Sequence, residues 1–305
     1  MSEQTLVSVL MPTYNGEQFV AETIESVLGQ TYKAIELIAV DDASTDETAA
    51  IVESYAVRFP DRVRLERRRQ RAGPCRRRND ALVLARGPIL AWLDQDDLWL
   101  PEKTERQVEI LEDRSDVGVV YTAFEAFDSR TGEMLPWQDD PPDAGEDMLR
   151  TLFVRGNIVP SISAVFRRAA LEHRGLRFRD RDFSFGDDYY LWLSLALDWR
   201  FERIPEKLTR YRRHARNESS RIGRTNYHQR RIALLQEFLR EFPEAGRRLG
   251  PARRRGLAGH YLDAANYEQT AGSRAGQARY FARAVATDPR WTLTTLRAQR
   301  ARASQ

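Results

Sequence analysis

The stretch Ile89-Leu90-Ala91-Trp92-Leu93-Asp94-Gln95-Asp96-Asp97 decides how the rest of this sequence is interpreted. Its first five residues form a continuous apolar run, which is typical of a short strand buried on both faces of a sheet. The run ends in three carboxylates within four residues, and such carboxylates repel one another unless a cation lies near them. Oxygen ligands of this kind suit Mg²⁺ or Mn²⁺. A solvated acidic turn before the helix that begins near Pro101 is the alternative.

The residues around this stretch alternate between strands and helices. Expected strands are 6–11, 37–40, 63–65 and 89–93, and expected helices are 17–29, 46–57 and 76–85. Ser44 or Thr45 is the expected cap of the second helix. The order βαβαβαβ predicts a mostly parallel sheet with helices on both faces, in which ligands bind beyond the carboxyl ends of the strands. Three of these ends have polar clusters: Thr13-Tyr14-Asn15, Asp41-Asp42, and Asp94 with Asp96.

The pattern becomes mixed after Pro101. Expected elements are a helix 101–113, strands 117–121 and 124–128 followed by a hairpin turn at 129–132, a strand 162–166, a helix 187–197, and strands 201–204 and 208–213. The Pro- and Asp-rich segment 137–145 is expected to form a loop that acts as a mobile lid. From about residue 221 the chain is helical and rich in arginine. We therefore predict an α/β domain over 1–222 and a helical C-terminal extension over 223–305.

Composition places the 305 residues among ordinary globular proteins, with 30% charged and 42% hydrophobic residues. One cysteine, Cys75, excludes an internal disulfide and fits a reducing compartment. The sequence has no apolar segment of about 18 residues and no secretory leader, so we expect a cytoplasmic protein, at most peripheral to a membrane. The arginine-rich run 62–78 lacks interleaved aromatic residues and lies near acidic strand ends, so we expect no nucleic acid partner.

An ordered set of short motifs is the most specific signal in the sequence. The motifs are Val7–Gly16, Ala39–Asp46, Arg78-Asn79, Asp94–Asp97, Gly186–Leu193 and Tyr211–His214. In this order and spacing they resemble the nucleotide-sugar glycosyltransferases of family 2, which have the Rossmann-like GT-A fold. The resemblance covers roughly residues 5–220. It rests on the whole set, because any single motif of this length is weak evidence.

The resemblance implies a site for a nucleotide-sugar donor. Its residues would be Pro12, Thr13, Tyr14, Asp42, Arg78, Asp94 and Asp96. The first three would lie beside the nucleobase, and Asp42 would accept a hydrogen bond from a base N–H. Asp41 and Asp42 could instead cap the helix that follows. Arg76 and Arg77 stand where the family has small residues. They could attract the diphosphate, but we interpret them as solvated surface.

The resemblance further implies a divalent cation, Mn²⁺ or Mg²⁺, that bridges the two phosphates of the donor. Asp96 and His214 are the implied ligands, and Asp94 would contact the ribose or a metal-bound water. Asp97 is expected to brace the loop or to cap the next helix. Asn217, Ser219 and Ser220 follow on a loop expected near the phosphates. A lone surface histidine is the alternative interpretation of His214.

A catalytic base is implied as well. Asp188 matches the second acid of the family's acid pair, while Asp187 replaces a glutamate. Asp188 would take the proton from an acceptor hydroxyl that attacks the anomeric carbon from the face opposite the diphosphate, which implies inversion. It could instead only stabilise the dipole of its helix. Asp187 and Trp192 are expected at the acceptor site, and Trp192 fits core packing equally well.

Together these expectations describe a metal-dependent, inverting glycosyltransferase of cell-surface glycan or polysaccharide biosynthesis. A UDP-sugar is the favoured donor, and the acceptor would be a saccharide, a lipid-linked saccharide or a protein. The alternative is a catalytically inactive glycosyltransferase-like scaffold. A nicotinamide-dependent dehydrogenase is excluded, because the turn after the first strand lacks G-x-G-x-x-G. The C-terminal helices could contact an anionic bilayer or form a homodimer, although an ordinary surface helix is the simpler interpretation.

Overall fold

The computed structural model describes residues 4–136, 147–179, 186–217 and 224–303. Contacts divide the chain into two units, which we describe separately. The sheet unit comprises residues 1–146, 158–191 and 198–214, and the helical unit comprises residues 147–157, 192–197 and 215–305. The domain boundary near residue 222 remains a prediction.

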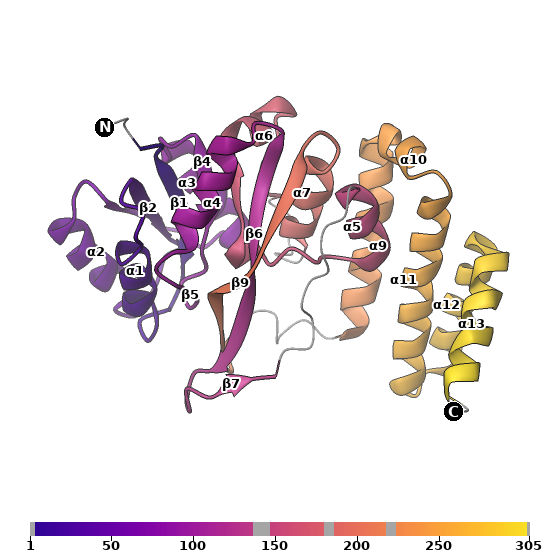
Figure 1. Ribbon diagram of the computed structural model, residues 1–305. Coiled ribbons are helices and arrows are strands. Elements are labelled where there is room, and N and C mark those ends of the chain that lie inside the picture. Colours follow the sequence, from indigo (N-terminus) through magenta and orange to yellow (C-terminus); the bar gives the residue numbers. More distant parts are fainter. Residues whose placement is uncertain (1–3, 137–146, 180–185, 218–223, 304–305) are drawn as a thin grey trace. The chain divides into compact units, whose positions relative to one another are not determined.

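A mixed but mostly parallel sheet organises the sheet unit (Figure 1). Its strands are β1 (Val7–Thr13), β2 (Ile35–Asp41), β3 (Val63–Arg67), β4 (Ile89–Trp92), β5 (Leu98–Trp99), β6 (Val117–Asp128), β7 (Met134–Leu135), β8 (Val165–Arg167) and β9 (Arg200–Arg213). They follow the order β3-β2-β1-β4-β8-β6-β9-β5, and β7 pairs with β6. The first four strands are parallel to one another, whereas β8 is antiparallel to both β4 and β6. The predicted α/β sheet is therefore confirmed.

Helices cover both faces of this sheet because β1 and β2 are apolar on both sides. The helices of the sheet unit are α1 (Val20–Leu28), α2 (Thr48–Arg58), α3 (Pro74–Leu84), α4 (Lys103–Asp113), α6 (Arg168–His173) and the start of α7 (Asp187–Leu195). Val7, Val9 and Met11 join one core cluster with α1, α2 and α4. Successive strand residues point to opposite faces. Leu10 and Ile38 are buried outside this cluster, and α3 packs on the same two strands.

Two pairs of expected strands each form one long strand in the structure. β6 runs through Thr122 and Ala123, and β9 runs through Pro205 and Glu206. The two long strands pair in parallel, and Ile204 lies opposite Thr122 while Lys207 lies opposite Ala123. The break seen in the sequence is thus a β-bulge, which adds residues to one strand without ending it.

The expected cap of α2 was wrong. The helix begins only at Thr48, its N-cap is Glu47, and no side chain of the N-cap residue bonds to the helix. An N-cap side chain bonds to the N–H two or three residues later, whereas Ser44 lies four residues before Thr48. Its Oγ donates to Asp41 Oδ1 at 2.5 Å. The Asp46 carboxylate accepts a hydrogen bond from the Thr48 N–H at 3.0 Å instead. Asp41 and Asp42 do not cap this helix either.

The helical unit is a set of helices around a small core of its own. It contains α5 (Met148–Arg155), the end of α7, α9 (Arg224–Glu241), α10 (Pro243–Leu249), α11 (Pro251–Thr270), α12 (Arg274–Thr287) and α13 (Pro289–Ala303). Pro243, Gly250, Gly272 and Pro289 separate these helices, as the sequence predicts. Ile232, Tyr261, Leu262, Tyr280 and Ala284 lie in the core, and α11, α12 and α13 pack side by side (Figure 1).

No helix within the described ranges 4–136, 147–179, 186–217 and 224–303 is long and apolar enough to cross a membrane.

A buried histidine joins two helices of the helical unit. His260 on α11 is 1% exposed, and its Nε2 lies 2.9 Å from the carbonyl oxygen of Phe153 on α5. Burial, helped by the charge of Arg231, lowers the pKa of His260 to about 4. The imidazole is therefore neutral in the folded protein at neutral pH.

We predict that the stability of the helical unit falls as the pH is lowered from 6.5 to 4. The pKa of His260 is lower in the folded than in the unfolded chain, so its contribution is complete above the unfolded value and is lost on acidification. The loss would reach about 3 kcal/mol. Urea unfolding followed by circular dichroism checks this: His260→Gln should flatten the profile, and His173→Gln, on a side chain that is 60% exposed, should not. Parallel profiles for wild type and His260→Gln would contradict the assignment.

Candidate functional site

The carboxyl ends of β1, β2 and β4 meet at one edge of the sheet. β1 lies between the other two strands, with Thr13 opposite Asp41 and Leu10 opposite Trp92. Thr13 Oγ1 donates to Asp41 Oδ1 at 3.3 Å. We call the residues at and near these ends the strand-end site; it consists of Pro12, Thr13, Tyr14, Asp42, Arg78, Asp94, Asp96, Asp187, Asp188 and His214. The expected convergence of the three polar clusters is therefore seen in the structure.

The turns after β1 and β2 are bonded to each other. The Asn15 N–H donates to Ser44 Oγ at 3.0 Å, and the Thr45 N–H donates to Asn15 Oδ1 at 2.9 Å. Asn15 and Ala43 have φ angles of 47° and 62°, in the left-handed region that residues other than glycine seldom adopt. Backbone conformations of this kind persist only where the surroundings hold them, and they cluster at functional sites.

Gln95 connects the turn after β4 to the turn after β1. Its Nε2 donates to the Tyr14 carbonyl at 2.9 Å, and its Oε1 accepts from the Tyr14 N–H at the same distance. A Cβ placed on Gly16 would lie 2.3 Å from this amide group. This role of Gln95 could not be recognised from the sequence, because an amide between acids has no distinctive chemistry. Its position between Asp94 and Asp96 was the available signal.

Asp42 is held by the loop before α3. It accepts hydrogen bonds from the Ala72 and Gly73 N–H groups, both at 2.8 Å, and from Arg77 Nε at 2.6 Å. A carboxylate has about four lone-pair positions, so one position is left for a further donor. The contact between Asp42 and a nucleobase remains a prediction. The guanidinium of Arg71 lies 4.1 Å from the centre of the Tyr14 ring, next to this loop.

The interpretation of Arg77 as solvated surface was wrong. Arg77 is 5% exposed, and besides Asp42 it donates to Asp80 at 2.5 Å and to the Gln70 carbonyl at 2.8 Å. Arg76, in contrast, is exposed. The helix position accounts for the difference, because adjacent residues on a helix point in directions about 100° apart. Arg77 is thus a part of the Asp42 environment that sequence reasoning missed.

Arg78 connects two acids from distant parts of the chain. Its Nη2 donates to Asp94 and its Nη1 to Asp187, each at 2.7 Å, and the guanidinium lies 5.1 Å from the Trp92 ring. Burial opposes the charge of Arg78, but the negative charges of Asp94 and Asp187 raise its pKa above the ordinary value. Arg78 Nε is buried and has no hydrogen-bond partner. The direct contact between Arg78 and a diphosphate remains a prediction.

The two acids at the start of α7 have different environments. Asp187 is 7% exposed, and its Oδ2 accepts from both Arg78 and the Cys75 thiol, the latter at 3.1 Å. Asp188 is half-buried, and its Oδ1 accepts from the Tyr189 N–H at 2.7 Å. Asp187 therefore has the environment of a structural acid, whereas Asp188 retains exposure to solvent. Trp192 is fully buried, which favours the core alternative over stacking on a sugar.

Asp96 and His214 form the pair that could hold a metal. Asp96 Oδ2 and His214 Nε2 lie 2.8 Å apart, and both side chains keep some exposure. The Phe19 ring packs against the imidazole, with the ring centres 4.6 Å apart. Within the described ranges no group of three or more acid, histidine or cysteine side chains could hold a metal. The residues fit a cation that takes two protein ligands and completes its shell from substrate phosphates and water.

Asp97 is turned away from that pair and supports the loop. It is 1% exposed, and its Oδ1 accepts from the Arg212 N–H at 2.9 Å. Burial, together with the charges of Asp96 and Asp94, raises the pKa of Asp97 well above its usual range. The predicted bracing role agrees with this geometry.

Some predicted parts of the site lie outside the described residues. They are the lid expected at 137–145 and the two serines Ser219 and Ser220. Asn217 is described and is buried.

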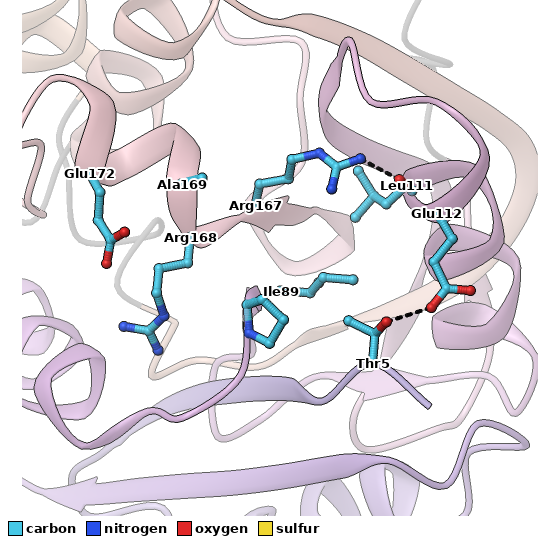
Figure 2. Close-up of a pocket in the computed structure, with 9 residues that line it drawn as sticks. Thr5, Ile89, Leu111, Glu112, Arg167, Arg168, Ala169 and Glu172 are labelled. Atoms are coloured by element: carbon cyan, nitrogen blue, oxygen red, sulfur yellow. Dashed lines mark hydrogen bonds between the residues drawn. The ribbon is translucent and has the colours of Figure 1, made fainter. Parts of the chain in front are cut away.

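A cavity of about 310 Å³ lies at the other end of the strands (Figure 2). Its lining includes Thr5 before β1, Ile89 at the start of β4, and Arg167 and Arg168 near the start of α6. Both arginines donate to backbone carbonyls, Arg167 to Val117 and Leu111, and Arg168 to Gly87 and Ala85. These arginines thus connect neighbouring backbone segments. The cavity lies at the opposite end of the strands from the strand-end site, and we assign it no ligand.

The sequence match identifies the class of protein as a glycosyltransferase. A family model described as glycosyl transferase family 2 matches residues 8–175, more than half of the chain. The chain belongs to this family, as the motifs predicted. It is similar to the "putative glycosyltransferase EpsE" of Bacillus subtilis (strain 168), with 37% identity over 63% of this chain and 67% of that protein.

Other relatives have more specific names. The UDP-Glc:alpha-D-GlcNAc-diphosphoundecaprenol beta-1,3-glucosyltransferase WfgD of Escherichia coli is 29% identical over 63% of this chain and 70% of that protein. The chain spans between half and about two thirds of the length of the curated relatives that it matches first.

Solved structures share the fold at low identity. TarS 1–349 of S. aureus in complex with UDP-GlcNAc has a TM-score of 0.68 and 19% identity, over 92% of this chain and 79% of that chain. The mannosyltransferase PcManGT of Pyrobaculum calidifontis, in complex with GDP-Man and Mn²⁺, has a TM-score of 0.59 and 23% identity, over 97% and 85% of the two chains. These similarities confirm the predicted GT-A fold.

We predict that Gly16→Ala damages the strand-end site by displacing Gln95. The three atoms nearest to the added Cβ all belong to the Gln95 amide group, at 2.3 to 2.7 Å. The double substitution Gly16→Ala with Gln95→Ala should therefore remove this overlap. Donor binding, measured by calorimetry, should fall for either single variant, and the double variant should be no weaker than Gln95→Ala alone. Additive losses in the double variant would show that Gly16 acts through something other than Gln95.

Proposed function

We propose that this chain is a metal-dependent, inverting glycosyltransferase that moves a sugar from a nucleotide-sugar donor, with a UDP-sugar favoured, to a hydroxyl group. The observation that carries the proposal is a cluster of contacts after β4, in which Asp96 contacts His214 and Arg78 joins Asp94 to Asp187. Parallel sheets bind ligands at this edge. Family membership supports the same chemistry.

The donor would lie along the strand-end site. Asp42, oriented by Arg77 and two backbone N–H groups, would accept a hydrogen bond from the base through its remaining lone pair. Asp94 would face the ribose. The preference for UDP is supported by WfgD, whose name includes UDP-Glc, and by the TarS complex with UDP-GlcNAc.

Asp96 and His214 would hold a divalent cation, which supplies charge neutralisation for the leaving diphosphate. The Mn²⁺ in the PcManGT complex supports this assignment. Arg212 of β9 holds two consecutive residues of the loop, because its backbone N–H donates to the Asp97 side chain and its Nε donates to the Asp96 carbonyl at 2.7 Å. The backbone that carries Asp96 is thus held by β9.

Asp188 would act as the base. It would take the proton of the acceptor hydroxyl while that oxygen forms a bond to the anomeric carbon and the bond from this carbon to the diphosphate breaks. Asp187, bonded to Arg78 on α3, fixes the start of α7 and so positions its neighbour. Attack from the side opposite the leaving group inverts the anomeric centre.

A lipid-linked saccharide is the acceptor class that we favour. The name of WfgD includes a diphosphoundecaprenol-linked sugar, and cell-surface polysaccharide biosynthesis is the process that such an acceptor serves. Acceptor binding by Asp187 is a weaker element of the proposal, because its Oδ2 is occupied by Arg78 and Cys75.

Calorimetric titration with UDP-sugars tests the donor and metal assignments together. We expect heat of binding with Mn²⁺ present, little heat after chelation, and loss of the metal-dependent part in Asp96→Asn. Glu206→Gln, on an exposed surface pair with Arg106, is the matched control and should bind as wild type does. Equal binding with and without the cation, or the absence of binding to every activated sugar, would remove the proposal.

We predict that Asp188→Asn keeps donor binding but lowers turnover by at least about a hundredfold, because a positioned base contributes about 10²–10⁴-fold. The amide is isosteric, so the thermal unfolding midpoint should stay close to that of wild type. Turnover is measured as nucleotide release with acceptor present. Near-normal turnover in Asp188→Asn would exclude Asp188 as the base. If the wild-type protein releases no nucleotide from any donor, the inactive scaffold is favoured.

A further inference from the structure

Charge is distributed very unevenly along this chain. Residues 215–305 contain 18 arginines, no lysine and 7 acids, a formal net charge of +11, whereas residues 1–214 contain 30 basic and 38 acidic residues. The overall charge of +3 hides this division. A general preference for arginine would not produce it, because arginine is also frequent in the acidic part. An asymmetry of this size indicates a surface that meets an anionic partner.

The excess is concentrated on α12 and α13. Residues 274–303 contain seven arginines and one acid, Asp288. The five arginines with described side chains, Arg274, Arg279, Arg283, Arg290 and Arg297, are all exposed. In the part of the chain that the structure describes, no ion pair joins any of these five to an acid. Arg231 on α9 shows the contrast, since it is buried and paired with Asp263 at 2.7 Å.

Apolar side chains lie among these arginines. Leu293 is 47% exposed and Phe281 is 39% exposed. Arg290, Leu293 and Arg297 follow the spacing i, i+3, i+7 and therefore share one face of α13. On the other side of the helix Thr292 is fully buried, and the flanking residues Trp291 and Leu296 pack on the core of the helical unit. The helix is thus held from one side and presents a mixed basic and apolar stripe on the other.

We propose that the outer faces of α12 and α13 bind the surface of an anionic phospholipid bilayer. Guanidinium groups attract lipid phosphates, and exposed Leu or Phe side chains between them enter the boundary between headgroups and acyl chains. The charge of the surface and that of the lipid are complementary. A nucleic acid would neutralise the arginines equally well but would leave Leu293 in water. The proposal goes beyond the transferase activity and does not depend on it.

Co-sedimentation of the full chain with vesicles tests the proposal. The vesicles are phosphatidylcholine alone, or phosphatidylcholine mixed with phosphatidylglycerol. We expect binding only to the mixed vesicles, weakened by added salt. The triple variant Arg274→Gln, Arg290→Gln and Arg297→Gln should bind at least about tenfold more weakly, because each arginine near an anionic surface contributes several-fold. Leu293→Ser should weaken binding with all charges retained.

A matched triple variant distinguishes the effect of where the arginines lie from the effect of the net charge of the protein. Arg64, Arg130 and Arg177 are exposed residues of the sheet unit, and their replacement by Gln removes the same charge. This control should bind mixed vesicles as wild type does. Circular dichroism and thermal unfolding verify that all variants are folded. Equal losses of binding in the two triple variants would overturn the proposal, and so would the absence of vesicle binding by the wild-type protein. Tighter binding to single-stranded DNA that is unchanged by Leu293→Ser would also overturn it.

Discussion

The strand-end site depends on one buried guanidinium. Arg78 on α3 holds Asp94 after β4 and Asp187 at the start of α7, residues separated by more than ninety positions of sequence. Removing one partner of a buried charge pair costs about 3–5 kcal/mol, because it leaves the remaining charges uncompensated. The arrangement therefore fixes the first acid of the turn and the first acid of the helix relative to each other. Asp96 and Asp188, which the proposed chemistry uses, are close neighbours of these two anchors in sequence.

The same principle recurs throughout the site: fixed donors orient acids before any substrate is bound. Two backbone N–H groups and Arg77 orient Asp42, while the Arg212 N–H orients Asp97. Burial and the charges of Asp96 and Asp94 raise the pKa of Asp97, which reflects the cost of holding these acids close together. Preorganised polar groups need little rearrangement during a reaction. The site thus tolerates acids that would otherwise repel one another.

Much of the fold followed from the sequence, because continuous apolar runs and helical periodicity report burial directly. The order of strands and helices up to Asp97, the convergence of three strand ends and the breaks at Pro243 and Pro289 were predicted in this way. The environment of Arg77 could not be predicted, because Asp42 lies 35 residues away in the sequence and only folding brings the two side chains together. The predicted cap of α2 was wrong because the helix begins only at Thr48, which leaves Ser44 outside its first turn. The single strand β9 was predicted as two strands, because a proline such as Pro205 is rare inside a strand.

Cys75 gives this molecule a built-in reporter. Its thiol is the only one in the sequence, is 4% exposed, and donates to the Asp187 oxygen that Arg78 also bonds. An alkylating reagent can reach the sulfur only when that cluster separates. The rate of alkylation under native conditions therefore measures how often α3 and the start of α7 part from each other, in the same way that amide exchange measures local opening. This measurement needs no engineered label.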